Sequence, residues 1–169
     1  MKPYEQSVLE ALAAEVGSLL LANGQRLVTA ESCTGGWAAQ CLTAIAGSSR
    51  WFERGFVTYS NEAKIELLGV GAGLLAAQGA VNEATAAAMA LGALQHSHAD
   101  WALAITGVAG PDGGSPGRPV GTVCFGWAGP DGQSDTDTCR FSGGREAVRA
   151  QSVGHALQGV LQRAGRLQA

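Results

Sequence analysis

The sequence predicts an α/β protein: a three-layer α/β/α sandwich with a mixed, mostly parallel sheet and a late antiparallel hairpin. Two observations favour this fold. Short apolar runs typical of buried strands alternate with segments of helical periodicity, and a Gly-Pro-Asp-Gly turn at 129–132 joins two later strand-like runs. The chain has 169 residues, 46% hydrophobic and 15% charged, which fits one domain, 1–169, with a sizeable core.

Each element follows from its residue pattern. Apolar residues at helical spacing predict an opening helix from about Glu5 to Leu21, ended by Asn23-Gly24. Strands are predicted at 26–30, 52–59, 100–106, 120–128 and 135–141. Further helices are predicted at 37–45, from Ser60 or Asn61 to about Gly69, at 82–97 behind an Asn82 cap, and from 142–144 to about Arg163. The segment 107–119 is too rich in glycine and proline for regular structure, and so long a loop is usually functional or mobile.

Composition excludes several classes of function. A net charge of -3 and a pI near 5.5 give no basic field, which argues against nucleic acid as the main partner. No apolar run approaches the ~20 residues that span a bilayer, and no leader pattern opens the chain, so a cytoplasmic protein without membrane contact is expected. The cysteines and histidines show no metal-binding spacing, so no metal is expected. These residues are Cys33, Cys41, Cys124, Cys139, His96, His98 and His155.

The segment Thr29–Trp37 is the most informative part of the chain. A strand-like run ends in Ser32, a hydroxyl residue and two glycines follow, and a helical pattern begins at once. The first turn of a helix has free backbone N–H groups and the positive end of the helix dipole, so it can hold an anion or a developing oxyanion. The simpler interpretation is that Ser32 or Thr34 only caps the helix.

A second strand end supplies a candidate base for Ser32. A serine hydroxyl needs a base to become a nucleophile, and no histidine completes a triad pattern here. Lys64 falls in the first turn of the helix that follows Tyr59, where the dipole and any burial lower the pKa of an amine from about 10.4. Tyr59 is placed to relay a proton or hold the lysine. The alternative is an exposed lysine beside a tyrosine that packs at a strand end.

Other residues offer competing or additional chemistry. A Cys33 thiolate at a helix start is an alternative nucleophile, although a free cysteine commonly fills a small apolar space. Arg145 and Arg149 lie one turn apart at the start of the last helix, and such a pair suits a phosphate monoester or a solvated helix surface. The loop after Thr106 matches neither phosphate-binding glycine motif, although its backbone amides can form an anion nest.

Long ordered blocks of this sequence resemble the CinA C-terminal domain family, the nicotinamide-nucleotide amidohydrolases. These blocks are T-A-E-S-C-T-G-G-W at 29–37, A-G-S-S-x-W-F-x-x-G-F-V-T-Y-S-N-E-A-K at 46–64, I-T-G-V-A-G-P-D-G-G at 105–114, P-V-G-T-V at 119–123 and G-G-R-E-A-V-R at 143–149. The resemblance implies hydrolysis of the carboxamide of nicotinamide mononucleotide to nicotinic acid mononucleotide and ammonia. It also implies an α/β/α fold, a homodimer, and no metal or other cofactor.

The resemblance also assigns roles to individual positions. It makes Ser32 the nucleophile and Lys64 its general base, with Tyr59 assisting. It places backbone N–H groups from Cys33 through Thr34 to Gly35 around the oxyanion. It adds three pocket-forming positions: Ser49, Thr106 and Arg145.

Two departures from the family pattern affect the expected phosphate affinity. Gly144 stands where relatives often carry an acidic residue, and Arg118 takes a position commonly held by lysine. The second hypothesis is a catalytically silent domain that binds nucleotides or partner proteins. A structural oligomerisation module would explain the alanine-rich helix at 82–94 but not polar residues gathered at three strand ends.

Overall fold

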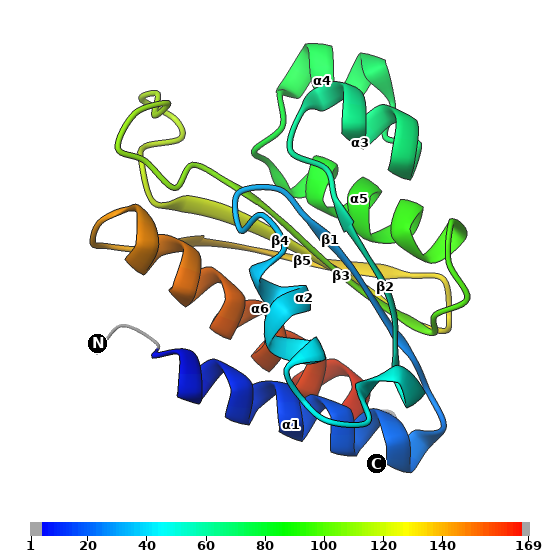
Figure 1. The fold of residues 1–169 in the computed structure, drawn as a ribbon. Coiled ribbons are helices and arrows are strands. Elements are labelled where there is room, and N and C mark those ends of the chain that lie inside the picture. The colour runs from blue at the N-terminus through cyan, green and yellow to red at the C-terminus, as the bar shows by residue number, and fades with distance from the viewer. Residues whose placement is uncertain (1–4, 167–169) are drawn as a thin grey trace.

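The protein folds around one five-stranded sheet with helices on both faces. The computed structural model describes residues 5–166, and Figure 1 shows the sheet running between two groups of helices. The strand order is β2-β1-β3-β4-β5. The strands are β1 Leu27–Glu31, β2 Phe52–Val57, β3 Trp101–Gly107, β4 Thr122–Ala128 and β5 Ser134–Arg140. Each predicted strand is therefore present, with ends that differ from the predicted ones by at most two residues.

The sheet is mixed, as predicted. Strand β1 pairs in parallel with both β2 and β3, whereas β3–β4 and β4–β5 are antiparallel. Only β4 therefore runs against the other strands, and β4 and β5 form the predicted late hairpin across the turn at 129–132. The Gly129 N–H donates to the Gln133 carbonyl in this turn, 3.2 Å away.

The helices form two outer layers. Helices α1 (Gln6–Asn23), α2 (Trp37–Thr43) and α6 (Arg145–Arg166) pack together on one face of the sheet. Helix α5 (Glu83–Gln95) covers the other face, with α3 (Asn61–Leu68) and α4 (Ala72–Gln78) beside it (Figure 1). The three-layer sandwich is thus confirmed. The sequence did not predict α4 or the short 3-10 helix Ser48–Arg50.

Two apolar cores, one on each face, hold the layers together. The larger lies under α1, α2 and α6 and includes the fully buried Trp51 and Trp127. The smaller lies under α5, where alanines from helix and strands allow close approach. Gly126 of β4 shows how close: a Cβ there would lie 2.3 Å from the carbonyl oxygen of Ala86. No helix within residues 5–166 has the length and apolar character needed to cross a membrane.

The topology determines where polar side chains gather. The chain leaves β1 through α2 on one face and reaches β3 through α5 on the opposite face. In open α/β sheets, such a reversal opens a crevice outside the carboxyl ends of the strands. Ser32 follows β1, Thr58–Ser60 follows β2, and Val108 follows β3, so all three segments meet at this edge.

Candidate active site

The turn after β1 is built around a buried carboxylate. Glu31 is fully buried, and its side chain accepts hydrogen bonds from the Ala38 and Ala39 N–H groups, at 2.8 and 3.0 Å, and from the Thr34 hydroxyl at 2.7 Å. A carboxylate at a helix N-terminus is stabilised by the free amides and by the helix dipole. Glu31, rather than Ser32 or Thr34, is therefore the side chain that caps α2, which leaves the Ser32 hydroxyl available for another role.

The Lys64 amine lies next to that hydroxyl. Ser60 caps α3 by accepting the Ala63 N–H at 3.0 Å, so Lys64 falls in the first turn of this helix, as predicted. Helical side chains lean toward the N-terminus of their helix, which carries Lys64 back over the end of β2. Its Nζ donates to Ser32 Oγ at 3.0 Å, to the Thr58 carbonyl at 2.8 Å and to the Tyr59 carbonyl at 3.3 Å.

Lys64 is buried without a counter-charge. The residue is 1% exposed, and among residues 5–166 no carboxylate forms an ion pair with it. Burial penalises the charged form of an amine and lowers the pKa of Lys64 from its ordinary value of 10.5. Its three neighbours are a hydroxyl and two carbonyl oxygens, all of them neutral. Burial therefore shifts the equilibrium of Lys64 toward the uncharged amine, the form that can accept a proton from serine.

Cys33 is the competing nucleophile, and its surroundings disfavour the thiolate. The side chain is 6% exposed and belongs to the larger apolar core. Burial, with a smaller contribution from the charge of Glu31, raises the pKa of the Cys33 thiol to about 12. A thiol of such pKa stays protonated near neutral pH and is a weak nucleophile.

Ser32 and Lys64 open into a cavity of about 290 Å³. Tyr59, Thr106 and Arg145 also line it, together with the loop that follows β3. The Thr106 hydroxyl is directed to the Ala80 carbonyl at 2.8 Å, so it joins the wall to the segment before α5. Arg145 donates to the Gly110 carbonyl at 2.8 Å and to the Tyr59 hydroxyl at 3.2 Å, which brings the start of α6, the loop and the end of β2 together.

Arg149 contacts the backbone of the turn that carries Ser32. Its Nε donates to the Cys33 carbonyl at 3.1 Å and its guanidinium also donates to the Thr34 carbonyl at 3.0 Å. The guanidinium carbon lies 5.2 Å from the centre of the Trp37 ring. Arg149 therefore holds the turn that carries Ser32 with two of its five donors, and the binding of a phosphate by Arg145 and Arg149 together stays a prediction.

Three further predicted site residues lie outside this cavity. Thr34 is fully buried and bonds to Glu31, and the Gly35 N–H donates to the Ser32 carbonyl at 3.0 Å. Ser49 belongs to the 3-10 helix before β2. Because Leu27 pairs with Phe52 in the parallel β1–β2 ladder, Ser49 lies at the amino end of the strands, opposite Ser32. Ser49 therefore does not line this cavity within one chain. The expectation for Thr34 and Gly35 concerns their backbone N–H groups at the oxyanion and stays a prediction.

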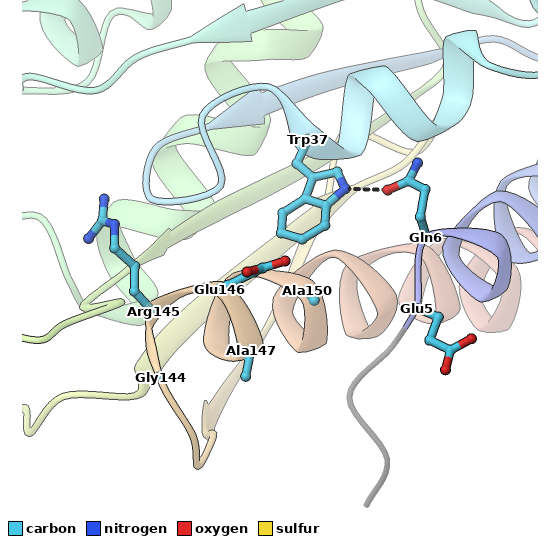
Figure 2. A pocket seen from close by; sticks show the side chains of 8 residues that line it. All are labelled: Glu5, Gln6, Trp37, Gly144, Arg145, Glu146, Ala147 and Ala150. Carbon is cyan, nitrogen blue, oxygen red and sulfur yellow. Dashed lines mark hydrogen bonds between the residues drawn. The ribbon is translucent and has the colours of Figure 1, made fainter.

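A larger hollow, of about 730 Å³, lies between the starts of α1 and α6. Figure 2 shows Trp37 at its centre, with the indole N–H donating to Gln6 Oε1 at 2.8 Å, while Arg145 points away from the indole. Its lining contains no serine, cysteine, lysine or histidine. The residues that line it are Glu5, Gln6, Trp37, Gly144, Arg145, Glu146, Ala147 and Ala150. We place the candidate active site in the smaller cavity because the nucleophile and base lie there.

Comparison with known proteins identifies the family of this chain. Residues 9–164 match the CinA C-terminal domain. The chain belongs to the CinA C-terminal domain family. It is 54% identical over 156 residues to nicotinamide-nucleotide amidohydrolase PncC of Escherichia coli, covering 92% of this chain and 94% of the relative. It is 47% identical over 154 residues to PncC of Pseudomonas putida, covering 91% and 96%.

Solved structures of this family share the fold. A competence/damage inducible protein of Agrobacterium tumefaciens superposes with a TM-score of 0.89 at 44% identity, covering 91% of this chain and 94% of that one. A CinA superfamily protein of Klebsiella pneumoniae gives a TM-score of 0.90 at 44% identity, covering 94% and 98%. The predicted family and fold are thus confirmed.

Proposed function

We propose that this member of the CinA C-terminal domain family is a nicotinamide-nucleotide amidohydrolase. It hydrolyses the carboxamide of nicotinamide mononucleotide to nicotinic acid mononucleotide and ammonia, with Ser32 as the nucleophile and Lys64 as its general base. One observation carries the assignment: a buried amine without a counter-charge lies 3.0 Å from a serine hydroxyl. The high identity to amidohydrolases named for this substrate supports it.

The reaction proceeds through an acyl-enzyme. Ser32 Oγ attacks the carboxamide carbon while Lys64 Nζ takes the hydroxyl proton. The tetrahedral intermediate then breaks its C–N bond, and Lys64 gives its proton to the leaving nitrogen, which departs as ammonia. Water attacks the acyl carbon as Lys64 takes a proton from it, and the Ser32 ester bond breaks as Lys64 returns that proton to Ser32 Oγ. The products are a nicotinate carboxyl group and the free serine.

The hydrogen bonds of Lys64 prepare it for the first step. In the neutral amine, two N–H bonds can point to the Thr58 and Tyr59 carbonyls at 2.8 and 3.3 Å. The tetrahedral geometry of nitrogen then directs the lone pair toward Ser32 Oγ. Both carbonyls also stabilise the ammonium that forms when Lys64 takes the proton, so they support the base in both of its charge states.

The Ser32 turn supplies donors for the developing oxyanion. Because the Gly35 N–H already donates to the Ser32 carbonyl, we assign the oxyanion to the N–H groups of Cys33 and Thr34. Arg149 donates to the carbonyl oxygens of these same two residues. The Cys33 carbonyl and the Thr34 N–H belong to one peptide unit, so Arg149 holds the Thr34 donor in place from the side opposite to the reaction.

Arg145 is the candidate phosphate ligand. A guanidinium has five N–H donors, and two hydrogen bonds from Arg145 go to Gly110 and Tyr59. The remaining donors are available for a phosphate at the exposed start of α6. Tyr59 is 62% exposed and bonds to Arg145, so we place it at the mouth of the cavity as an assisting residue.

The proposal includes a homodimer and needs no metal or cofactor. Apolar side chains remain exposed along and beyond edge strand β2, at Val57, Tyr59 and Ile65, where a second copy can cover them. Light scattering after gel filtration tests this assignment: twice 17.2 kDa is expected, and a monomer at assay concentration would overturn it. Since the reaction uses only side chains, turnover should survive EDTA.

The decisive experiment is ammonia release from nicotinamide mononucleotide by the wild type and three variants. Ser32→Ala and Lys64→Met should lose at least about 1,000-fold in kcat, because each removes a member of one catalytic unit. Cys33→Ala should keep most of its turnover. Loss confined to Cys33→Ala would establish a thiol enzyme, and nucleotide binding without turnover by the wild type would establish the catalytically silent alternative.

A further inference from the structure

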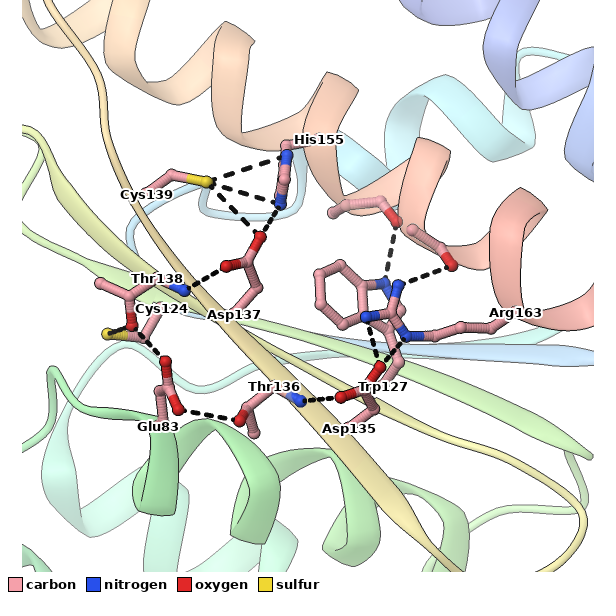
Figure 3. A network of polar contacts seen from close by, with 12 residues as sticks. Glu83, Cys124, Trp127, Asp135, Thr136, Asp137, Thr138, Cys139, His155 and Arg163 are labelled. Atoms are coloured by element: carbon pink, nitrogen blue, oxygen red, sulfur yellow. Dashed lines mark hydrogen bonds and ion pairs between the residues drawn. The ribbon is translucent and has the colours of Figure 1, made fainter.

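Strand β5 carries a second group of reactive side chains, away from the Ser32 cavity. Successive side chains of a strand point to opposite faces. Thr136 and Thr138 point to α5, where both donate to Glu83, at 3.0 and 2.9 Å. Asp137 and Cys139 point to α6, as Figure 3 shows.

Three different ligand types converge on this α6-facing side. The Oδ2 atom of Asp137 lies 2.9 Å from His155 Nε2. The Sγ atom of Cys139 lies 3.5 Å from the same nitrogen, 3.9 Å from His155 Nδ1 and 3.8 Å from Asp137 Oδ2, so binding an ion at Nε2 requires the imidazole to turn relative to the sulfur. Figure 3 shows the three side chains pointing toward one another from β5 and α6.

The geometry points to a divalent transition-metal site of the zinc class, formed by Asp137, Cys139 and His155. Zinc binds carboxylate oxygen, imidazole nitrogen and thiolate sulfur at about 2.0, 2.1 and 2.3 Å. In a tetrahedron with these bond lengths, neighbouring ligand atoms lie about 3.3–3.6 Å apart. The observed separation of 3.5 Å lies within that range, and those of 2.9 and 3.8 Å differ from it by a few tenths of an ångström.

The neighbours of these ligands favour binding. Asp137 Oδ1 accepts the Thr138 N–H at 2.8 Å, which fixes the carboxylate and leaves Oδ2 for the ion. The His155 ring lies 4.5 Å from the Phe125 ring, centre to centre, and also packs against Trp127 and Phe141. Such outer contacts orient ligands and raise metal affinity.

Charge and access also suit a dication. A thiolate and a carboxylate balance the two positive charges of Zn²⁺, and the imidazole binds in its neutral form. The side chains of His155 and Asp137 are 30% and 47% exposed, so an ion can enter and a water can fill the fourth position. The bound ion would tie edge strand β5 to α6, and it would replace the contact between His155 and Asp137.

Cobalt spectroscopy tests the site, because a Co²⁺–thiolate bond gives a charge-transfer band in the near ultraviolet. The wild type with Co²⁺ should show this band together with the visible bands of tetrahedral cobalt. Cys139→Ser should lose the charge-transfer band. Cys124→Ser is the matched control and should keep it, because Cys124 faces Thr138 on the other side of the sheet.

Zinc affinity, measured by calorimetry, gives the second readout. Cys139→Ser and His155→Gln should each bind Zn²⁺ at least about 100-fold more weakly than the wild type, since each removes a direct ligand. Zinc should also raise the thermal midpoint of the wild type and of Cys124→Ser. No charge-transfer band on the wild type, or an unchanged band on Cys139→Ser, would overturn the proposal. Neither readout depends on amidohydrolase activity.

Discussion

Replacing Arg149 tests whether the Ser32 turn must be held rigid for catalysis. The guanidinium donates to the Cys33 and Thr34 carbonyls at 3.1 and 3.0 Å, and it lies 5.2 Å from the Trp37 ring. Because Arg149 is half-buried, each hydrogen bond is worth about 1 kcal/mol and the ring contact about 0.5 kcal/mol. Arg149→Ala should therefore remove about 2.5 kcal/mol of interaction energy that holds the turn.

A fraction of that energy should appear in the transition state, since the turn supplies the proposed oxyanion donors. Each 1.36 kcal/mol corresponds to about tenfold in rate, so kcat should fall about tenfold if half of that energy is lost, and at most about 70-fold if all of it is lost. Arg149→Lys keeps the charge but has fewer donors, so its kcat should lie between those of the wild type and Arg149→Ala. KM should change little if Arg145 binds the phosphate.

Arg163→Ala is the matched control for this experiment. Arg163 also lies on α6, 3.8 Å from the centre of the Trp127 ring, and forms an ion pair with Asp135, but it lies away from the Ser32 cavity. Steady-state ammonia release by folded variants provides the measurement. A wild-type kcat for Arg149→Ala, or an equal loss for Arg163→Ala, would refute the reasoning.

Three further predictions concern Glu31, Cys33 and Lys64. Glu31→Gln should lower the free energy of unfolding in urea by about 2–4 kcal/mol, because a buried carboxylate that accepts three hydrogen bonds becomes an amide; a loss below about 0.5 kcal/mol would contradict its capping role. Cys33 should react slowly with iodoacetamide at about pH 8 in the folded protein, since burial raises its pKa to about 12; peptide mapping that shows rapid labelling would oppose this. Finally, kcat/KM should rise with pH through the lowered pKa of Lys64, because the neutral amine is the active form and its population grows as pH rises. A flat profile from about pH 6 to 9 would count against a lysine base.

Local patterns predicted the strand ends well. The Ser60 cap places Lys64 in the first turn of α3, and the Asn82 cap accepts the Thr85 N–H at 2.7 Å as expected. These features depend on residues close in sequence, so turn and capping rules suffice for them. Pairing Ser32 with Lys64 required only that β1 and β2 be parallel neighbours.

Features that depend on tertiary contacts were not accessible in this way. No role was predicted for Glu31, which follows the strand predicted at 26–30, because its role as the α2 cap depends on the path of the turn. The Arg149 side chain spans 115 and 116 positions in sequence to reach its partners. Ser49 was assigned to the pocket by resemblance alone, and the parallel register places it at the opposite end of the sheet. Helix α4, Ala72–Gln78, has few turns and no side-chain cap.

The proposed metal site at Asp137, Cys139 and His155 also depends on tertiary contacts that local sequence rules cannot predict. Cys139 and His155 follow no recognised spacing in the sequence, so the cysteine and histidine pattern gave no sign of it. They meet only because β5 pairs with β4 and presents alternate side chains to α6.

Direct titration of the Lys64 amine is the sharpest test of the account. The chain contains only two lysines, Lys2 and Lys64, so protein labelled with ¹³C at the lysine ε-carbon gives two resonances to follow against pH by NMR. Lys64→Met assigns them by removing one. The account predicts that the Lys64 resonance titrates clearly below the ordinary value of 10.5. A Lys64 resonance that titrates at or above 10.5 would show a charged amine beside Ser32 at neutral pH, and would contradict Lys64 as its base.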